Sequence, residues 1–156
     1  MRMRFKQVVE AVPQLRGAFR PGLQALKGEH RGRIRCSDTR RLAGSLDLDS
    51  SLQDSLPDDP RWDYGVGVTV RQDADRCHWV EVHPATEGEV RNVLKKQDWL
   101  KAWLGRHAPV LLEMTATENG YVWIATKAIG FRPGSPKAKQ LEARGISLPC
   151  KRFVIP

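Results

Sequence analysis

Two apolar segments in the middle of the chain have the pattern of neighbouring strands. Residues 62–71 and 77–83 are rich in Val, Trp and Tyr, and a polar run, Gln-Asp-Ala-Asp, lies between them. Short apolar runs bounded by turn residues are typical of buried strands joined as a hairpin. We therefore expect two antiparallel strands here.

The clearest helical pattern follows these strands. Thr86 and Glu89 have the spacing of a capping box, and apolar residues then recur every three or four positions as far as Leu104. Gly105 is expected to end this helix. The pattern predicts that one face of the helix covers one face of the sheet.

Shorter patterns occupy the rest of the chain. Residues 5–28 have apolar residues at helical spacing, but Pro13 and Pro21 divide them into short pieces. The remaining predicted elements are a basic strand or arm at 31–36, a strand at 42–49 that passes into a short helix capped by Asp49 or Ser50, a hairpin of strands at 109–117 and 121–129 about the turn Asn119-Gly120, a helix at 135–143 and a strand at 152–155.

This order of elements predicts a mixed α/β fold in a single domain, with a central mixed sheet flanked by helices. The chain has 156 residues, the size of one ordinary domain, and no linker or internal repeat divides it. We expect residues 1–41 to form a basic helical segment and arm, packed on or flanking a sheet core formed by residues 42–156.

Composition narrows the class of protein. Hydrophobic residues make up 40% of the chain and charged residues 28%, as in soluble globular proteins. No apolar run approaches the roughly 18 residues that a membrane span needs. The three cysteines are far apart and form no pair typical of a zinc ribbon or a disulfide framework. We therefore expect a cytoplasmic protein with no membrane partner.

Charge is unevenly distributed along the chain, whose net charge is +8. Residues 1–41 hold eleven Lys and Arg against three acidic residues, whereas residues 42–75 hold eight Asp against two Arg. Basic flanks suit a polyanion such as nucleic acid, and an acidic island can hold a cation. A solvated, arginine-rich surface explains the same pattern. The residues that we expect to contact nucleic acid are Arg31, Arg33, Arg35, Arg40 and Arg41.

Each of the two central strands brings one acidic residue, Asp63 or Glu81, into apolar surroundings. Burying a carboxylate is costly unless it is paired or binds a metal. A hairpin about residues 72–75 needs only a small shift of register to bring the two carboxylates close on one face. His83, two residues after Glu81, shares that face. Such a group is a reasonable oxygen-rich site for Mg²⁺ or Mn²⁺.

An Asp, and then a Glu on the next strand, within the order helix, three strands, helix, strand, resembles the PD-(D/E)XK nuclease superfamily. The resemblance implies a restriction-endonuclease-like core in which Asp63 and Glu81 hold Mg²⁺ or Mn²⁺ for phosphodiester hydrolysis in DNA or RNA. The superfamily signature ends in Glu-x-Lys, and His83 takes the lysine's position here. Either His83 serves as base or ligand, or Lys96 reaches in from the following helix. Glu10 would correspond to an accessory acid that some members carry.

A purely structural interpretation remains open for the same residues. Asp63 would then bond Arg61 or a backbone amide, and Glu81 would pair with a buried cation. The domain would in that case be a non-catalytic nucleic-acid-binding module or a protein-interaction module. Its partner would be nucleic acid, a second copy of the chain in a homodimer, or another protein.

Overall fold

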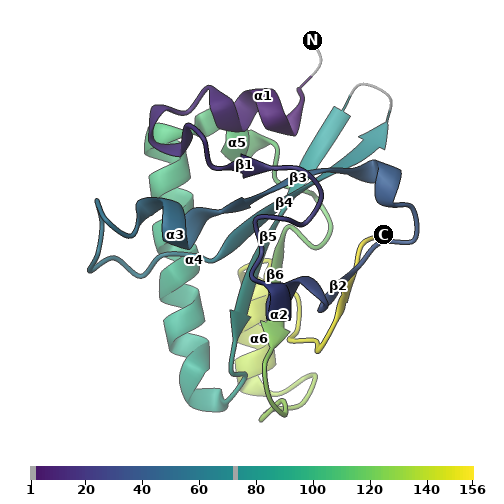
Figure 1. The fold of residues 1–156 in the computed structure, drawn as a ribbon. Helices are drawn as coiled ribbons and strands as arrows, with labels where there is room; N and C mark the ends of the chain where they lie inside the picture. Colours follow the sequence, from purple (N-terminus) through teal and green to yellow (C-terminus); the bar gives the residue numbers. More distant parts are fainter. Residues whose placement is uncertain (1–2, 72–73) are drawn as a thin grey trace.

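A five-stranded mixed sheet runs through the middle of the structure (Figure 1). The computed structural model describes residues 3–71 and 74–156. Neighbouring strands are antiparallel except β5 and β6, which are parallel, so the predicted mixed α/β fold is confirmed. In spatial order the strands are β1 (Phe19–Arg20), β3 (Leu42–Asp47), β4 (Tyr64–Arg71), β5 (Ala74–His83) and β6 (Tyr121–Ala125).

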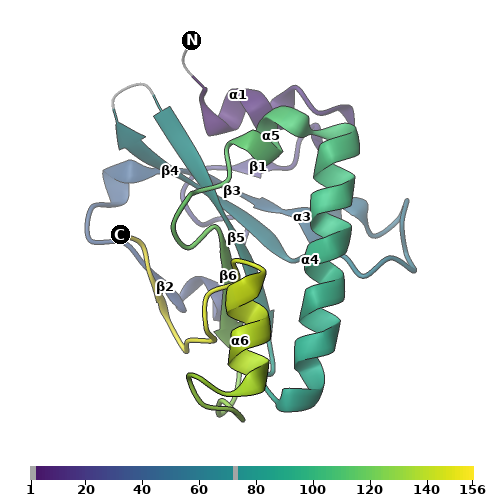
Figure 2. The ribbon, with the colours of Figure 1, turned by 180° about the vertical axis from the view of Figure 1, so that it is seen from behind.

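Four helices cover one face of this sheet (Figures 1 and 2). They are α1 (Phe5–Glu10), α4 (Glu87–His107), α5 (Pro109–Glu113) and α6 (Pro136–Ala143), while α3 (Leu48–Leu52) continues from the end of β3. The long helix α4 lies between β5 and β6 in the chain, because parallel neighbours need a crossover connection. No helix in the described ranges is long and apolar enough to cross a membrane.

The opposite face is covered by a layer that we call the outer layer, residues 23–41 and 150–156. Its short strands pair in parallel with each other rather than with the central sheet. It contains α2 (Gly28–Arg31), β2 (Ile34–Arg35), the 3₁₀ turn η2 (Thr39–Arg41) and β7 (Phe153–Val154).

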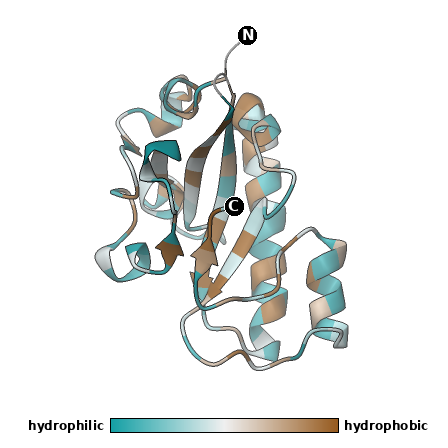
Figure 3. Cartoon of the chain, turned by 90° about the vertical axis from the view of Figure 1, so that its right-hand side faces the viewer, coloured by the Kyte–Doolittle hydropathy of each residue, from teal (hydrophilic) through white to brown (hydrophobic). Residues whose placement is uncertain are grey.

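The sheet therefore separates two hydrophobic cores. The core beneath the helices includes Trp62, Trp79 and Trp123, which are fully buried. The core beneath the outer layer joins strand residues such as Val66 to Phe153 and other apolar residues of that layer. Hydrophobic residues gather on the central strands and the inner sides of the helices (Figure 3). Burial on both faces explains why β4 and β5 are almost continuously apolar in sequence.

The predicted hairpin at 109–117 and 121–129 is wrong. Residues 109–113 form α5, with Pro109 at its first position, and β6 pairs in parallel with β5. A short apolar run fits a buried helix as well as a strand, and proline is well suited to the start of a helix. Asn119, with φ of 53°, bends the chain into β6 instead of closing a hairpin.

Other boundaries differ in detail. The helical pattern over 5–28 forms α1, a 3₁₀ turn (Pro13–Leu15) and the short strand β1, and α4 continues past Gly105 to His107. Thr86 is the N-cap residue of α4, but its side chain makes no capping hydrogen bond. The side chain of Asp47, rather than Asp49 or Ser50, caps α3. The predicted helix α6 and the terminal strand β7 are present.

Candidate functional site

The pairing of β4 with β5 brings Asp63 opposite Glu81. Tyr64 pairs with Val80, so the residue before Tyr64 falls beside the residue after Val80. The backbone N–H of Asp63 donates to Oε1 of Glu81 over 3.1 Å, and the N–H of Val82 donates to Oδ2 of Asp63 over 3.0 Å. Each carboxylate therefore accepts a backbone hydrogen bond from the other's strand.

The backbone of Asp63 is also fixed by the start of α3. The N–H groups of Leu48 and Asp49 donate to the Asp63 carbonyl over 2.9 and 3.2 Å. Arg61 pairs with Asp49 at 3.0 Å, so the contact between Arg61 and Asp63 that sequence left open is replaced by another. These bonds hold Asp63 in place on the backbone and leave its half-buried carboxylate directed at β5.

Lys96 reaches Glu81 from the crossover helix. The Glu81 side chain is 0% exposed, and the Lys96 ammonium donates to its Oε2 in an ion pair. Lys96 itself is 22% exposed, whereas its neighbour Lys95 is exposed to solvent and makes no such contact. The structure thus brings together three of the predicted site residues, Asp63, Glu81 and Lys96.

Burial shapes the protonation of this group. Desolvation and, after it, the nearby Asp63 carboxylate raise the pKa of Glu81 to about 8, against the opposing effect of Lys96. Burial also raises the pKa of Asp63, again opposed by the charge of Lys96. Burial is the largest single influence on Lys96 and works against its charge, but the charge and hydrogen bond of Glu81, together with the charges of Asp63 and Asp49, raise its pKa. Glu81 therefore holds a proton more readily than an exposed glutamate.

His83 lies at the end of β5 between two carboxylates. Its Nδ1 is 3.6 Å from Oε2 of Glu81, and its Nε2 donates to Oε2 of Glu89 over 2.5 Å. Asn92 donates to the same Glu89 oxygen over 3.0 Å, and these hydrogen bonds lower the pKa of Glu89. The sequence assigned Glu89 only to helix capping. The sequence feature that could have indicated this contact is the position of Glu89 in the first turn of the helix, six residues after His83.

The oxygen ligands in this group suit one class of metal. Among residues 3–71 and 74–156, no group of three or more His, Cys, Asp or Glu side chains is arranged to hold a metal ion. Mg²⁺ is commonly held by one or two carboxylates, with water and substrate phosphate completing its shell. Asp63 and Glu81 fit that description once the hydrogen bond from Lys96 to Oε2 of Glu81 is broken.

The predicted nucleic-acid contacts lie in or beside the outer layer. Arg33 donates to the Ala125 carbonyl over 3.2 Å, and Ala125 pairs with His83, so Arg33 lies near the candidate site. The other four are placed as follows: Arg31 donates to the Leu26 carbonyl, Arg35 is exposed on β2, Arg40 pairs with Asp38, and Arg41 donates to the Thr69 carbonyl.

Glu10 lies away from this group. It is exposed at the end of α1, and Met3, just before that helix, bridges to Ala74 at the hairpin end of β5. Glu81 and His83 lie toward the other end of the same strand. The accessory position implied by the resemblance is therefore not beside the two carboxylates.

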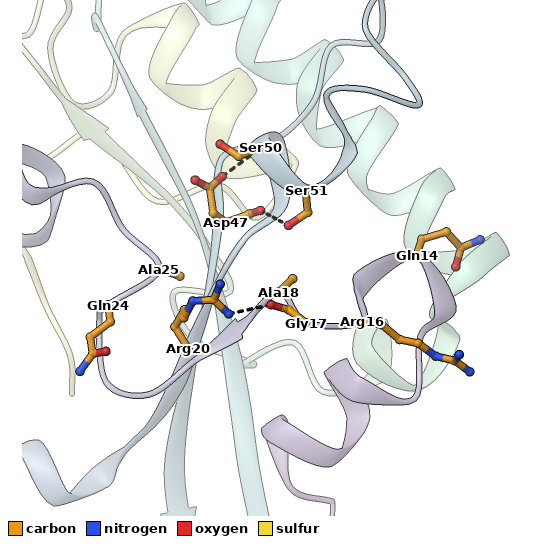
Figure 4. A pocket seen from close by; sticks show the side chains of 10 residues that line it. All are labelled: Gln14, Arg16, Gly17, Ala18, Arg20, Gln24, Ala25, Asp47, Ser50 and Ser51. Carbon is orange, nitrogen blue, oxygen red and sulfur yellow. Dashed lines mark hydrogen bonds between the residues drawn. The ribbon is translucent and has the colours of Figure 1, made fainter.

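A separate polar hollow of about 410 Å³ lies between residues 14–25 and the start of α3 (Figure 4). The guanidinium of Arg20 turns back to donate to the Gly17 carbonyl over 2.6 Å. Asp47, which also lines the hollow, accepts the N–H of Ser50 over 2.9 Å. These charged groups serve local backbone bonds, so we place the candidate chemistry at Asp63 and Glu81.

The chain matches no family model, no curated protein and no solved structure. The functional conclusion consequently depends on the geometry of Asp63, Glu81 and Lys96, and on the order of the elements that bring them together.

Proposed function

We propose that this protein is a metal-dependent nuclease that hydrolyses phosphodiester bonds in DNA or RNA. The observation that carries the proposal is the ion pair between Lys96 and buried Glu81, with Asp63 directly opposite. Two carboxylates and one lysine meet at a single point of an otherwise apolar sheet. The order α1, β3, β4, β5, α4, β6 also supports it, because it is similar to the core order of the PD-(D/E)XK superfamily.

Each residue has a distinct role in the proposal. Asp63 and Glu81 would hold Mg²⁺ or Mn²⁺, and the bound ion would polarise the phosphodiester and lower the pKa of the attacking water. Lys96 supplies from α4 the cation that the Glu-x-Lys signature places on the strand. Released from Glu81, its ammonium donates to the attacking water or to a phosphate oxygen. Glu89 keeps the His83 ring oriented toward Glu81.

A second candidate is a non-catalytic nucleic-acid-binding module on the same scaffold. It is favoured by the pairing already present, because Glu81 bonds Lys96 and His83 bonds Glu89. A network whose charges are satisfied by one another is also what a structural role requires. The nuclease candidate requires a bound divalent ion and catalysis, whereas the binding-module candidate requires neither.

Metal-dependent cleavage separates the two candidates. Purified wild type is incubated with plasmid DNA and with single-stranded RNA, in Mg²⁺, in Mn²⁺ and in a chelator, beside Glu81→Gln and the exposed control Glu113→Gln. We expect cleavage by wild type and Glu113→Gln that the chelator abolishes, and a loss of about a hundredfold or more in Glu81→Gln. Equal cleavage by wild type and Glu81→Gln would overturn the proposal. Salt-dependent binding without turnover would establish the second candidate.

A further inference from the structure

A hollow of about 440 Å³ lies at the hairpin end of β4 and β5, far along the strands from Glu81. Its walls come from four segments distant in sequence: the β4–β5 pair, the turn η2, the loop that leads into β6, and Pro156. Its floor includes Val68 and the buried ring of His78, which is held by the Asn119 carbonyl. Three arginines line it, namely Arg41, Arg71 and Arg76.

These arginines give the hollow a positive charge. Arg71 is exposed and Arg76 half-buried, and neither pairs with an acidic residue in the described part of the chain. Arg41 donates to backbone oxygens of Thr69 and Pro156 at 3.2 and 2.8 Å, which fixes its guanidinium in the wall of the hollow. Glu118 is the acidic side chain among the described residues that line the hollow.

The positive charge continues across the outer layer. A second hollow, of about 550 Å³, lies in the outer layer and is lined by residues that include Arg35, Thr39 and Val154. The described residues of the outer layer hold eight Lys and Arg against Glu29 and Asp38. At the other end of this layer Arg33 contacts Ala125, beside His83. The surface thus lies on the outer-layer face of the sheet, opposite the face that carries Glu81, and Arg33 reaches the end of the sheet beside His83.

We infer that this surface binds the phosphate backbone of the nucleic acid, with Arg71 and Arg76 as phosphate contacts remote from the cleaved bond. The inference rests on the proposed function and names how its substrate is held. Guanidinium groups pair with phosphate oxygens in two-point hydrogen bonds, and unpaired arginines in a concave surface are available for them. The chain's excess of positive charge favours a polyanion of extended length.

Strand geometry sets a lower limit on the length of nucleic acid that reaches both places, because Arg76 and Glu81 point to opposite faces of β5 and the path passes round the sheet. Seven residues separate Glu81 from Ala74 along β5, a rise of about 24 Å at roughly 3.4 Å per residue. That distance corresponds to about seven base pairs of B-form duplex. A shorter duplex cannot reach both the candidate site and the hairpin end, so the contribution of Arg71 and Arg76 depends on substrate length.

Binding is tested with a matched pair of double variants. Arg71→Gln/Arg76→Gln is compared with Arg16→Gln/Arg106→Gln, which removes two exposed arginines elsewhere and leaves the same net charge. Fluorescence anisotropy with a labelled duplex of about two helical turns is recorded over a range of salt, without divalent ion. At about 0.1 M salt we expect affinity to fall roughly tenfold per arginine in the first variant, and the salt slope to fall by about 1 per arginine.

The outcomes separate the surface from the chemistry. An equal loss in both double variants, or no loss in either, would overturn the surface assignment. So would displacement of the duplex by polyglutamate at equal charge concentration, because the partner would then be an acidic protein. Suppose that wild type cleaves DNA and that Arg71→Gln/Arg76→Gln cleaves long and short duplexes equally well. The assignment of this surface is then wrong, while the proposed nuclease function is supported. If that variant loses binding while wild type never cleaves, the assignment of the surface is supported and the nuclease proposal is wrong.

Discussion

The Glu81 carboxylate lies in surroundings that are unfavourable for a charge. It is fully buried, and it depends on the Asp63 N–H and the Lys96 ammonium for partners. Removing one member of a buried ion pair leaves the other uncompensated, and this costs more than the pair itself contributes. Stability measurements on Lys96 and Glu81 therefore report how strongly the site is coupled to the fold.

We expect Lys96→Met to lower the free energy of unfolding by about 2–3 kcal/mol, because Glu81 loses its cation while the helix keeps a long apolar side chain. Lys95→Met, on the exposed neighbour, should change stability by less than about 0.5 kcal/mol. Urea unfolding at about pH 9, above the raised pKa of Glu81, measures both. The double variant Lys96→Met/Glu81→Gln should recover most of the loss, and no recovery would contradict the pairing.

The raised pKa of Glu81, from 4.5 to about 8, predicts the sign of a pH effect. Between these values the folded state keeps a proton that the unfolded chain releases. The contribution of Glu81 to stability is therefore full below about pH 4.5 and is lost as pH rises toward 8. Urea unfolding of wild type should accordingly lose, relative to Glu81→Gln, up to a few kcal/mol between about pH 5 and 8. A constant difference across this range would contradict the shift.

The sequence suggested that Asp63 and Glu81 lie close, although a hairpin about residues 72–75 needed a small shift of register to bring them together. The shorter connection, in which Arg71 pairs with Ala74, supplies that shift. Lys96 was one of the two residues expected to replace the lysine of the signature, and the 3.6-residue helical period directs it, rather than Lys95, toward Glu81. The bond from His83 to Glu89 was not predicted. It depends on how the chain turns between β5 and α4, and no periodicity encodes that turn.

At the scale of elements, the contact between α1 and the sheet depends on a close approach. A Cβ on Gly67 of β4 would overlap the ring of Phe5, which is fully buried at the start of α1. The helix can pack this tightly because glycine presents no side chain. Elements with a strong internal pattern, such as α4 and the β4–β5 pair, were predicted well. The short helix α5 was not, because tertiary packing decides the structure of a five-residue apolar run.

We expect Gly67→Ala to destabilise the protein by about 2–3 kcal/mol, because the added methyl group displaces α1 from the sheet. Gly88→Ala is the matched control, since the nearest atom to its added methyl is Thr86 Oγ1 at 4.0 Å. On the first turn of α4 this change should be neutral or stabilising by about 0.5–1 kcal/mol. Thermal and urea unfolding compare the two, and similar losses would show that the Phe5 contact is unimportant.

At the scale of the whole molecule, the outer layer is part of the fold as well as a charged surface. Its apolar side chains close the second core against β4, β5 and β6. Sequence alone did not reveal this, because β2 and β7 are each two residues long and pair across most of the chain. Contacts between segments so far apart leave no local pattern from which they could be predicted.

We expect Phe153→Ala to lower the free energy of unfolding by about 3 kcal/mol, because Phe153 is buried between β7 and the sheet. Val154→Ala, one residue later and 63% exposed, should change it by less than about 0.5 kcal/mol. A single cooperative transition in the Phe153 variant would show that both cores unfold together. Separate transitions by tryptophan fluorescence and circular dichroism would contradict that.

The crossover helix α4 decides where the positive charge beside Glu81 lies. It returns directly over β5, so Lys96 meets Glu81 although fifteen residues separate them in sequence. The position of this positive charge is therefore set by the topology of the crossover rather than by a fixed spacing along one strand.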